Sequence, residues 1–466
     1  PDAAAPAPSV TGVRRTKRKL VLTDGVEAKS EARVTRAHAR RGKGVADIGP
    51  LSMIKIGSTA IGERKRPSEP LVEVRASSYY MDNRQIFTSF IASLFGPYKE
   101  KLGASAGAVT CKTSGQREQS LFTHQEIVRD YINMYTPYRG VLLYHGLGSG
   151  KTCASVAIAE GLKNNKKVYI MTPASLQANY RADLKKCGDP LYRKNQFWEF
   201  VKITGPDDKL VDVLSAALTL PMEWIRRNKG AWMVNVKNAG NFGTLDAAQK
   251  ASLDTQLDEM VNQKYRFLNY NGMRSSHLAA LSENHTKNPF DNSVVVIDEA
   301  HNFVSRIVNK LRKPDSLSAR LYQYMMAADG ARIVMLSGTP IINYPNEIAV
   351  MFNMLRGMIK TWYFKLSVAT QRKISEATLR DVFKKFGLLD YLEYRPTSTT
   401  LVVTRNPFGF YSVDSRSTYK GVALGERGDV DDDSFVAIIT SLLQKNNIKI
   451  TPSATRVEMY KALPDT

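Results

Sequence analysis

A short apolar stretch that runs directly into a glycine-rich loop constrains this chain more than any other feature. Residues 141–144, VLLY, have the aliphatic makeup of a buried parallel strand. The loop HGLGSG follows at 145–150, and residues 151–162, KTCASVAIAEGL, continue as a helix. This order predicts a phosphate-binding loop, because backbone N–H groups and the helix N-terminus then converge on one anion.

The residues of this loop have separate expected roles. Lys151 is expected to contact the β- and γ-phosphates of ATP, and the Thr152 hydroxyl is expected to hold Mg²⁺. One position departs from the strict G-x-x-x-x-G-K-T pattern, because His145 stands where that pattern has a glycine. The residues expected to bind the nucleotide here are Gly146, Gly148, Ser149, Gly150, Lys151 and Thr152.

A second apolar strand, at 294–297, ends in the acidic pair Asp298 and Glu299. Acidic residues at the carboxyl end of a parallel strand lie where ligands bind in open α/β sheets. Asp298 is expected to hold Mg²⁺, largely through water, and Glu299 to orient and deprotonate the attacking water. Such a pair could instead cap the following helix, but the upstream phosphate loop favours a catalytic role.

A third apolar strand begins at Arg332 and ends in Ser337, Gly338 and Thr339. Three apolar strands that each end in small or polar residues predict one parallel sheet with its functional residues along one edge. The predicted fold class is therefore α/β.

The order of these motifs resembles the first motor lobe of superfamily 2 helicases and translocases. The resemblance rests on the phosphate loop, on D-E-A-H at 298–301 and on S-G-T-P at 337–340. It implies a RecA-like lobe that uses ATP and Mg²⁺ and has a nucleic-acid partner. It also implies that Ser337, Gly338 and Thr339 link the nucleotide state to the grip on nucleic acid.

Weaker motifs fit the same lobe. Gln125 resembles the upstream glutamine that reads adenine in this superfamily, and a surface glutamine on a helix is the alternative. Thr172 and Pro173 resemble the segment that contacts the nucleic-acid backbone, with Ser175 as a helix cap. Residues 266–272, RFLNYNG, lie where a further backbone-contact motif would fall.

Three longer stretches narrow the resemblance to the helicase-like ATPases of nucleocytoplasmic large DNA viruses, a group with poxvirus early transcription factors and nucleoside triphosphate phosphohydrolases. These stretches are 142–161, 294–303 and 336–356. The resemblance implies an ATP-dependent, nucleic-acid-stimulated helicase or translocase in viral early transcription or genome handling. A viral RNA polymerase or another transcription-factor subunit is the implied protein partner. The implied location is the virion and the host cytoplasm, with the nucleus as an alternative.

The composition adds a polyanionic partner to these expectations. The 466 residues carry a formal net charge of +22, which favours nucleic acid over a merely soluble surface. The viral resemblance implies DNA before RNA as that partner. No apolar run approaches the roughly 18 residues of a membrane span, so no membrane partner is expected. The three cysteines form no C-x-x-C pair, and neither a zinc site nor a disulfide framework is expected.

Composition changes along the chain predict four regions. Residues 1–50 read as a basic disordered arm and 51–120 as an N-terminal extension. Residues 121–360 form the expected ATP-binding lobe, with a helical insertion at about 205–262. Residues 361–466 read as a linker and the start of an incomplete second lobe, or as an accessory domain, and 373–392 within them is expected to form one amphipathic helix.

Two alternatives remain open at this stage. No Q-x-x-G-R-x-x-R-like run follows residue 360, so the source of an arginine finger is open and the chain could be inactive in this truncated form. A rival hypothesis is a virion-packaged structural or scaffold protein with a weakly active ATPase lobe. Trp224 and Trp232 could stack on nucleic-acid bases, although packing in a core is the favoured interpretation.

Overall fold

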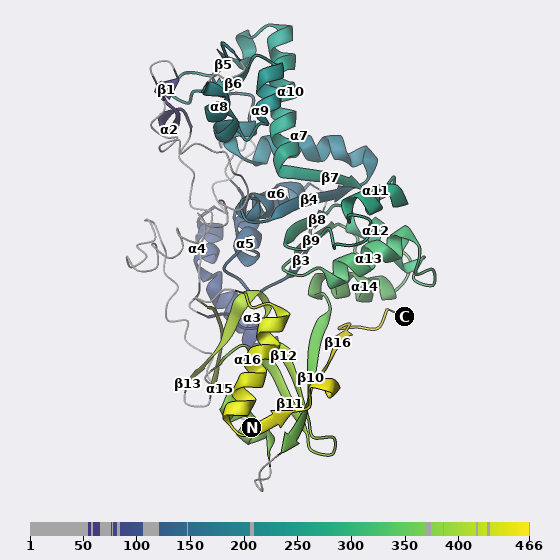
Figure 1. Ribbon diagram of the computed structural model, residues 1–466. Coiled ribbons are helices and arrows are strands. Elements are labelled where there is room, and N and C mark those ends of the chain that lie inside the picture. The colour runs from purple at the N-terminus through teal and green to yellow at the C-terminus, as the bar shows by residue number, and fades with distance from the viewer. Residues whose placement is uncertain are drawn as a thin grey trace. The chain divides into compact units, whose positions relative to one another are not determined.

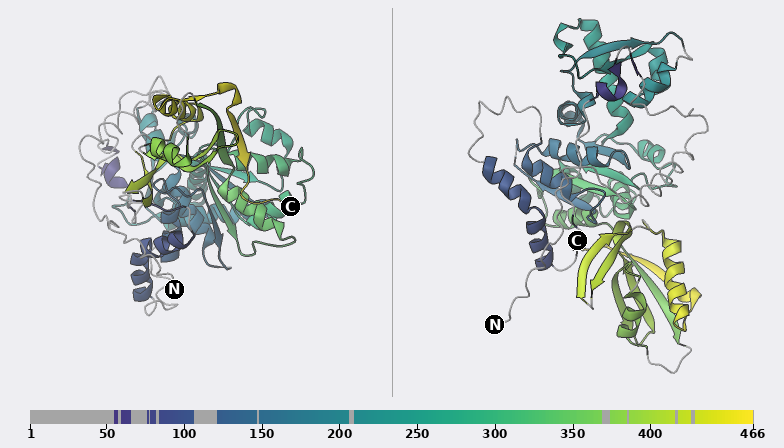
Figure 2. Two further views of the ribbon diagram at one scale, coloured as in Figure 1. Left: turned by 90° about the horizontal axis from the view of Figure 1, so that it is seen from below. Right: turned by 90° about the vertical axis from the view of Figure 1, so that its left-hand side faces the viewer.

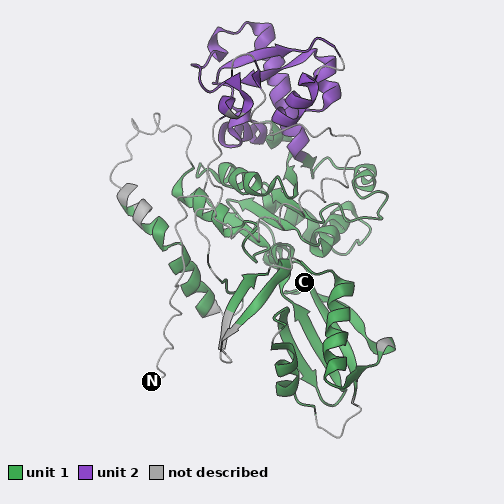
Figure 3. Cartoon of the chain, turned by 60° about the vertical axis from the view of Figure 1, so that its left-hand side comes forward, with its two compact units in different colours: residues 1–14, 74–178, 267–466 green, residues 15–73, 179–266 purple. Residues whose placement is uncertain are grey.

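The computed structural model describes residues 55–56, 59–65, 76, 78–81, 84–105, 121–146, 148–205, 209–368, 374–384, 386–415, 418–425 and 429–465. The arm expected at 1–50 lies outside the described residues. The chain divides into two compact units, coloured separately in Figure 3. Unit 1 contains the described residues of 74–178 and 267–466, and unit 2 contains those of 15–73 and 179–266.

A five-stranded sheet with strand order β3-β9-β8-β4-β7 forms the centre of unit 1. The bounds are β3 Gly140–Tyr144, β4 Lys167–Thr172, β7 Tyr265–Asn269, β8 Ser293–Ile297 and β9 Arg332–Ser337. The pairs β3–β9, β9–β8 and β8–β4 are parallel. Parallel neighbours require crossover connections, which the helices between the strands supply. The predicted α/β class with a RecA-like parallel-sheet lobe is confirmed.

Helices cover both faces of this sheet (Figure 1). On β8, Val295 and Ile297 belong to a buried core shared with α12, α13 and α14. Val294 and Val296 therefore face the opposite side, where α6 packs on β8 and β9. The helices of unit 1 around this sheet are α3 Arg84–Leu94, α4 Gly96–Ser105, α5 Thr123–Tyr131, α6 Lys151–Leu162, α11 Ser275–Leu281, α12 Ala300–Val308, α13 Leu317–Ala327 and α14 Asn346–Arg356.

The strands after residue 358 form a second, antiparallel sheet with order β11-β12-β10-β15, in which β16 also pairs with β10. The bounds are β10 Ile359–Val368, β11 Leu389–Arg395, β12 Thr400–Arg405, β15 Ile448–Ile450 and β16 Arg456–Tyr460. A hairpin of β13 Phe410–Ser415 and β14 Thr418–Leu424 lies between them in sequence. Among the described residues, these strands pair with one another in a sheet separate from that of the lobe.

Two helices, α15 Glu376–Lys384 and α16 Asp432–Lys445, share a buried core with the antiparallel sheet. Trp362 and Phe435 pack in it with ring centroids 4.6 Å apart. The sequence pattern favours one helix through 373–392, and this is wrong, because the residues after α15 pair with β12 as strand β11. Whether 361–466 begins a second lobe or is an accessory domain stays a prediction.

Unit 2 contains a short antiparallel sheet of β5 Trp198–Lys202 and β6 Gly230–Val234. Its other elements are α8 Leu210–Leu218, α9 Met222–Arg227, α10 Ala247–Lys264, β1 Lys55–Ile56, β2 Thr59–Ala60 and α2 Ile61–Arg64, and α7 Gln177–Cys187 begins in unit 1. Trp224 and Trp232 are buried, which confirms the core interpretation for both. Figure 2 gives two further views of all these elements.

Candidate functional site

The predicted phosphate loop joins the carboxyl end of β3 to the N-terminus of α6. Gly148 and Gly150 have φ angles of 75° and 76°, a left-handed conformation that glycine adopts without the steric cost of a side chain. A Cβ atom added to Gly150 would lie 2.5 Å from the Gln125 Nε2 atom. The glycine at this position is therefore required by its backbone angles and by its close neighbour.

Lys151 is folded back onto its own loop. Its Nζ atom donates to the backbone oxygens of His145 at 2.8 Å and Gly146 at 3.0 Å. These two acceptors are neutral carbonyls, and no carboxylate within the described ranges forms an ion pair with Lys151. The ammonium group can therefore exchange its carbonyl partners for phosphate oxygens, which would be stronger, charge-assisted acceptors.

The N-terminus of α6 has the features of an anion site. Gly150 occupies the N-cap position without a side-chain hydrogen bond, and the first turn of this helix has no acidic residue. The first N–H groups of a helix have no acceptor within the helix, and its dipole favours negative charge there. Together with the glycine cradle and Lys151, these residues fit the phosphates of a nucleotide.

Asp298 and Glu299 follow β8 at the same edge of the sheet. The Asp298 N–H donates to the Met171 oxygen at 2.9 Å, and Asp298 Oδ1 accepts the Glu299 N–H at 3.0 Å. Hard cations such as Mg²⁺ prefer carboxylate and hydroxyl oxygens. Asp298 and Thr152 supply these two oxygen types, so the residues present fit the expected Mg²⁺.

The peptide at Glu299 is held in an unusual conformation. Glu299 has a φ angle of 47°, which is uncommon for a residue with a side chain. The Tyr270 hydroxyl lies 3.2 Å from the backbone oxygens of both Asp298 and Glu299 and donates to them. Tyr270 is buried and lies within the segment 266–272 that the sequence places at a backbone-contact motif. Its contact with the acidic turn was not predicted, because its partners lie 28 and 29 positions away. Burial, with a smaller effect of the two acidic neighbours, raises the pKa of Tyr270, so its hydroxyl keeps its proton.

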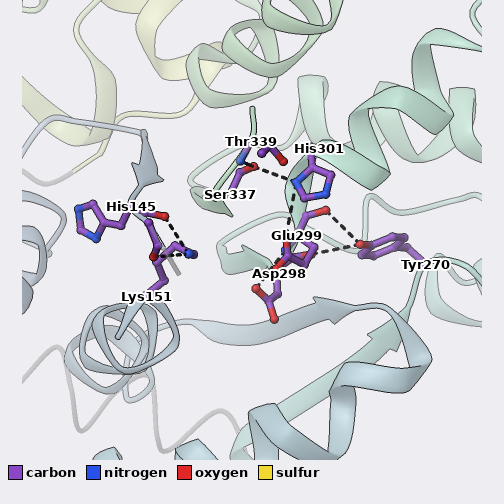
Figure 4. A network of polar contacts seen from close by, with 9 residues as sticks. His145, Lys151, Tyr270, Asp298, Glu299, His301, Ser337 and Thr339 are labelled. Atoms are coloured by element: carbon purple, nitrogen blue, oxygen red, sulfur yellow. Dashed lines mark hydrogen bonds and ion pairs between the residues drawn. The ribbon is translucent and has the colours of Figure 1, made fainter. Parts of the chain in front are cut away.

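A histidine joins the D-E-A-H and S-G-T-P motifs (Figure 4). His301 Nδ1 lies 2.9 Å from Ser337 Oγ and 3.4 Å from Glu299 Oε2. Ser337 Oγ also accepts the Thr339 N–H at 3.0 Å. A Cβ added to Gly338 would lie 3.9 Å from Lys151 Nζ, so the same segment borders the phosphate loop. The two motifs, 36 positions apart in sequence at His301 and Ser337, form one polar network.

Gln125 is buried under the phosphate loop and is not a surface residue of its helix. Its Nε2 atom donates to the Gly150 oxygen at 3.0 Å, and its Oε1 atom accepts the Phe122 N–H at 3.0 Å. The surface alternative is therefore wrong. The adenine-reading role stays a prediction, since what the structure shows directly is that Gln125 supports the loop.

The residues that are exposed after β4 differ from those expected to contact nucleic acid. Thr172 and Pro173 are buried, whereas Ser175 is exposed. Pro173 occupies the N-cap position of a 3₁₀ turn at Ala174–Leu176, so Ser175 lies inside the turn and does not cap it. The contact of Thr172 and Pro173 with nucleic acid stays a prediction, and in this arrangement it would be made by the backbone or by their neighbours.

Glu347 is a further residue that the sequence analysis did not identify. It is fully buried on α14, and its Oε2 atom accepts the N–H groups of Ile342 at 2.7 Å and Asn343 at 3.2 Å. Burial opposes ionisation, but these hydrogen bonds outweigh it and lower the pKa of Glu347. The loop after S-G-T-P is thereby fixed to α14. A glutamate early in a helix that follows a polar turn was the available signal.

Two cysteines differ from the expectation. Cys153, next to Thr152 on α6, and Cys187, at the end of α7, are both disulfide-bonded. The expectation that the chain has no disulfide framework is therefore wrong at these two residues.

Comparison with known proteins points to large DNA viruses. No family model matches the chain. A candidate ATP-dependent RNA helicase of Acanthamoeba polyphaga mimivirus is 28% identical over 234 residues, which cover 50% of this chain and 32% of that protein. A candidate helicase of Invertebrate iridescent virus 3 is 24% identical over 296 residues, covering 60% of this chain and 26% of that protein. A termination factor NPH-I homologue of African swine fever virus (isolate Pig/Kenya/KEN-50/1950) is 26% identical over 222 residues, covering 47% and 23%.

The chain is related to the superfamily 2 helicase-like proteins of large DNA viruses. The expected resemblance is thereby confirmed at the level of this group. The chain spans a third or less of the length of each of these three relatives. Within the described ranges, no helix combines the length and apolar character that a bilayer span needs.

Proposed function

We propose that this chain carries the ATP-binding lobe of a viral helicase or translocase and hydrolyses ATP in response to nucleic acid. The observation that carries the proposal is the contact between His301 and Ser337, which joins the D-E-A-H turn to the S-G-T-P turn beside Lys151. A sheet edge built only to bind a nucleotide has no need for this link. A motor needs it, because hydrolysis must change the grip on the nucleic acid.

The chemistry of the site assigns a role to each side chain. Lys151 and the N–H groups at the start of α6 bind and orient the phosphates. Thr152 and Asp298 would hold Mg²⁺, which neutralises charge on the β- and γ-phosphates when it is bound. Glu299 lies beside His301 and accepts a proton from the attacking water. The strand ends hold these side chains in place before the reaction. Little rearrangement of the site is therefore needed when charge develops on the phosphates.

The proposal of a nucleic-acid partner rests on the net charge of the chain and on the names of its relatives. A net charge of +22 gives a favourable, salt-dependent attraction to phosphates. The name of one relative says ATP-dependent RNA helicase, that of a second says helicase and that of a third says termination factor. We place this chain in viral transcription or genome handling, with DNA preferred over RNA and a viral RNA polymerase or transcription-factor subunit as protein partner. The virion and the host cytoplasm follow as its locations.

Phosphate release by the purified chain tests the proposal. The parent chain is expected to release phosphate from Mg-ATP faster when single-stranded DNA or duplex DNA is added. Glu299→Gln should abolish that increase. Equal release with and without every DNA and RNA tested would contradict a nucleic-acid-stimulated motor and favour a packaged scaffold with a weakly active lobe.

A further inference from the structure

A cavity lies at the end of the parallel sheet opposite to the phosphate loop, and the proposed function makes no use of it. Its volume is about 680 Å³, within the roughly 300–1,000 Å³ of ordinary ligand sites. Gly140 at the start of β3 and Gly330 shortly before β9 line the cavity, whereas the phosphate loop follows the other end of β3. All of its lining residues belong to unit 1. The cavity is therefore separate from the site that would bind ATP.

One wall of the cavity is the turn after β12, residues 406–409. Phe408 in this turn has a φ angle of 54° and a ψ angle of 31°, a left-handed conformation that is rare for a bulky side chain. The turn is held by Asn406, whose Nδ2 atom donates to the Gly387 oxygen at 3.0 Å and to Ser412 Oγ at 3.1 Å. Backbone strain of this kind clusters at ligand sites, where the surrounding contacts maintain it.

Two buried polar atoms of the cavity lining have no hydrogen-bond partner among the residues that the structure describes. They are Asn406 Oδ1 and the Nε1 atom of Trp362 on β10, and each of the two residues is 1% exposed. Most buried polar atoms in proteins are paired, and an unpaired one costs free energy that a ligand can recover. Asn406 Oδ1 requires a donor and the Trp362 N–H requires an acceptor. A fitting ligand therefore presents both.

The walls of the cavity are rich in aromatic rings. These come from Phe87, Tyr131, Tyr138, Phe352, Trp362 and Phe408. Phe352 on α14 is 46% exposed, so its ring is accessible from solvent. Aromatic side chains favour a flat ligand, which they contact by stacking or edge to face.

The charges around the cavity balance. Four cations line it, namely Arg139, Arg356, Lys360 and Arg405, together with three aspartates. Asp432, outside the lining, pairs with Lys360 at 2.6 Å and with Arg405 at 3.1 Å, and it supplies a fourth negative charge. A site without net charge favours an uncharged ligand over a phosphate-bearing nucleotide or strand, which an excess of cations would attract.

We propose that this cavity binds an uncharged nucleoside, which donates to Asn406 Oδ1, accepts from the Trp362 N–H and packs its base on the aromatic walls. A nucleobase is flat, carries donors and acceptors on its edge and stacks on aromatic side chains. The inference goes beyond the proposed function, because none of the described lining residues belongs to the phosphate loop or to the turns at 298–301 and 337–340.

Isothermal titration calorimetry with uridine and with inosine tests the proposal. The parent chain is first saturated with Mg-ADP, so that the proposed ATP site is occupied. At least one nucleoside should then bind, with one molecule per chain. Phe352→Ala should weaken this binding about tenfold, because it removes an accessible aromatic wall. The matched control is Ile348→Ala, one turn earlier on α14, where the side chain is 38% exposed and outside the lining, and it should bind like the parent.

A second variant tests the unpaired donor. Trp362→Phe removes the N–H and keeps a ring in the core, and it should weaken nucleoside binding about three- to tenfold, as expected for one lost hydrogen bond. In the control Trp232→Phe, the lost N–H already donates to Ser252 Oγ at 3.2 Å, so nucleoside binding should not change.

Amide hydrogen exchange locates the bound ligand. In the parent chain saturated with Mg-ADP, the nucleoside should slow exchange over residues 405–410 and leave residues 148–152 unchanged. Binding of neither nucleoside, or parent-like binding by both Phe352→Ala and Trp362→Phe, would overturn the proposal. Tighter binding of an oligouridylate than of uridine, with protection over 405–410, would overturn the assignment to an uncharged ligand.

Discussion

His301 and Ser337 lie on different motifs and share a contact of 2.9 Å between Nδ1 and Oγ. Ser337 is fully buried, and its Oγ atom also accepts the Thr339 N–H at 3.0 Å. A change at Glu299, whose Oε2 atom lies 3.4 Å from the same His301 nitrogen, therefore reaches the S-G-T-P turn through one side chain. Under the proposed function, this contact would link the state of the nucleotide site to the S-G-T-P turn.

Ser337→Ala should uncouple the two motifs. The parent chain is expected to bind DNA with different affinity in the presence of ADP and of a non-hydrolysable ATP analogue. In Ser337→Ala the ratio of these two dissociation constants should fall toward one, by about tenfold if the coupling is typical. Fluorescence anisotropy with labelled DNA measures it, and Ser282→Ala, a buried serine bonded within its own segment, is the control. An unchanged ratio in Ser337→Ala would show that His301 does not carry the coupling.

Glu299→Gln should separate binding from hydrolysis. The amide keeps the size of the side chain but cannot accept the proton of the attacking water, so the single-turnover rate should fall about a hundredfold or more. Nucleotide affinity should stay within about twofold, since Lys151 and α6 bind the phosphates. Glu283→Gln changes an exposed glutamate in the same way and serves as control. Parent-like turnover in Glu299→Gln would mean that another group is the base.

His145 occupies a position where a strict phosphate loop has glycine, and its contribution should be that of its backbone. Lys151 contacts the His145 carbonyl, which glycine also supplies. Burial, with added repulsion from His124 and Lys151, lowers the pKa of His145 below 6.5, so the ring is neutral at pH 7 and above. His145→Gly should therefore bind Mg-ATP within about twofold of the parent from pH 7 to 8.5.

Below pH 6.5 the two proteins should diverge. As the pH falls through the lowered pKa of His145, the parent gains a positive charge beside the phosphates, and His145→Gly does not. Calorimetric titration of ATP at several pH values measures the difference. A constant affinity ratio down to acidic pH would show that His145 does not titrate near the nucleotide.

Arg332 should be costly to remove from unit 1. Its guanidinium is buried, donates to the backbone oxygens of Tyr138 and of Thr136 (2.8 Å for the latter), and lies 3.6 Å from the ring centre of Phe408. Arg332→Met leaves two buried carbonyls without donors and should lower the free energy of unfolding by about 2–4 kcal/mol in urea titrations.

The control for Arg332 is Arg320→Met. Arg320 is partly exposed and lies 3.5 Å from Asp315, a surface ion pair whose loss should cost less than about 1 kcal/mol. Equal losses for the two variants would show that the Arg332 contacts do not stabilise the fold.

The sequence predicts those parts of the site whose signal is local. Ser337 ends an apolar strand, and Lys151 and Asp298 each follow one, so pattern and spacing alone place them at one sheet edge. Their contacts with Tyr270 and Gln125 depend on pairings between distant segments, for which a single sequence contains no signal. The same holds for the antiparallel sheet, where Ile359 pairs with Tyr460 across most of that region.

Residue propensities also give the wrong secondary structure or burial at positions where tertiary packing determines the outcome. The run after Lys384 has apolar residues at helical spacing, yet it pairs with β12 as a strand because Leu392 and Leu401 share one buried core. Glutamine is a residue type common on helix surfaces, yet Gln125 is buried beneath the phosphate loop. These outcomes follow from the assembled layers and not from any single element.

The most direct test of the account is the affinity of the chain for Mg-ATP with and without the Lys151 ammonium. Isothermal titration calorimetry on the parent chain should show one binding site that depends on Mg²⁺. Lys151→Ala should weaken binding about tenfold or more, because it removes the cation from the phosphates, whereas Lys163→Ala at the other end of α6 should bind like the parent. Parent-like binding by Lys151→Ala, or no binding by the parent chain, would contradict the assignment of this loop as the nucleotide site.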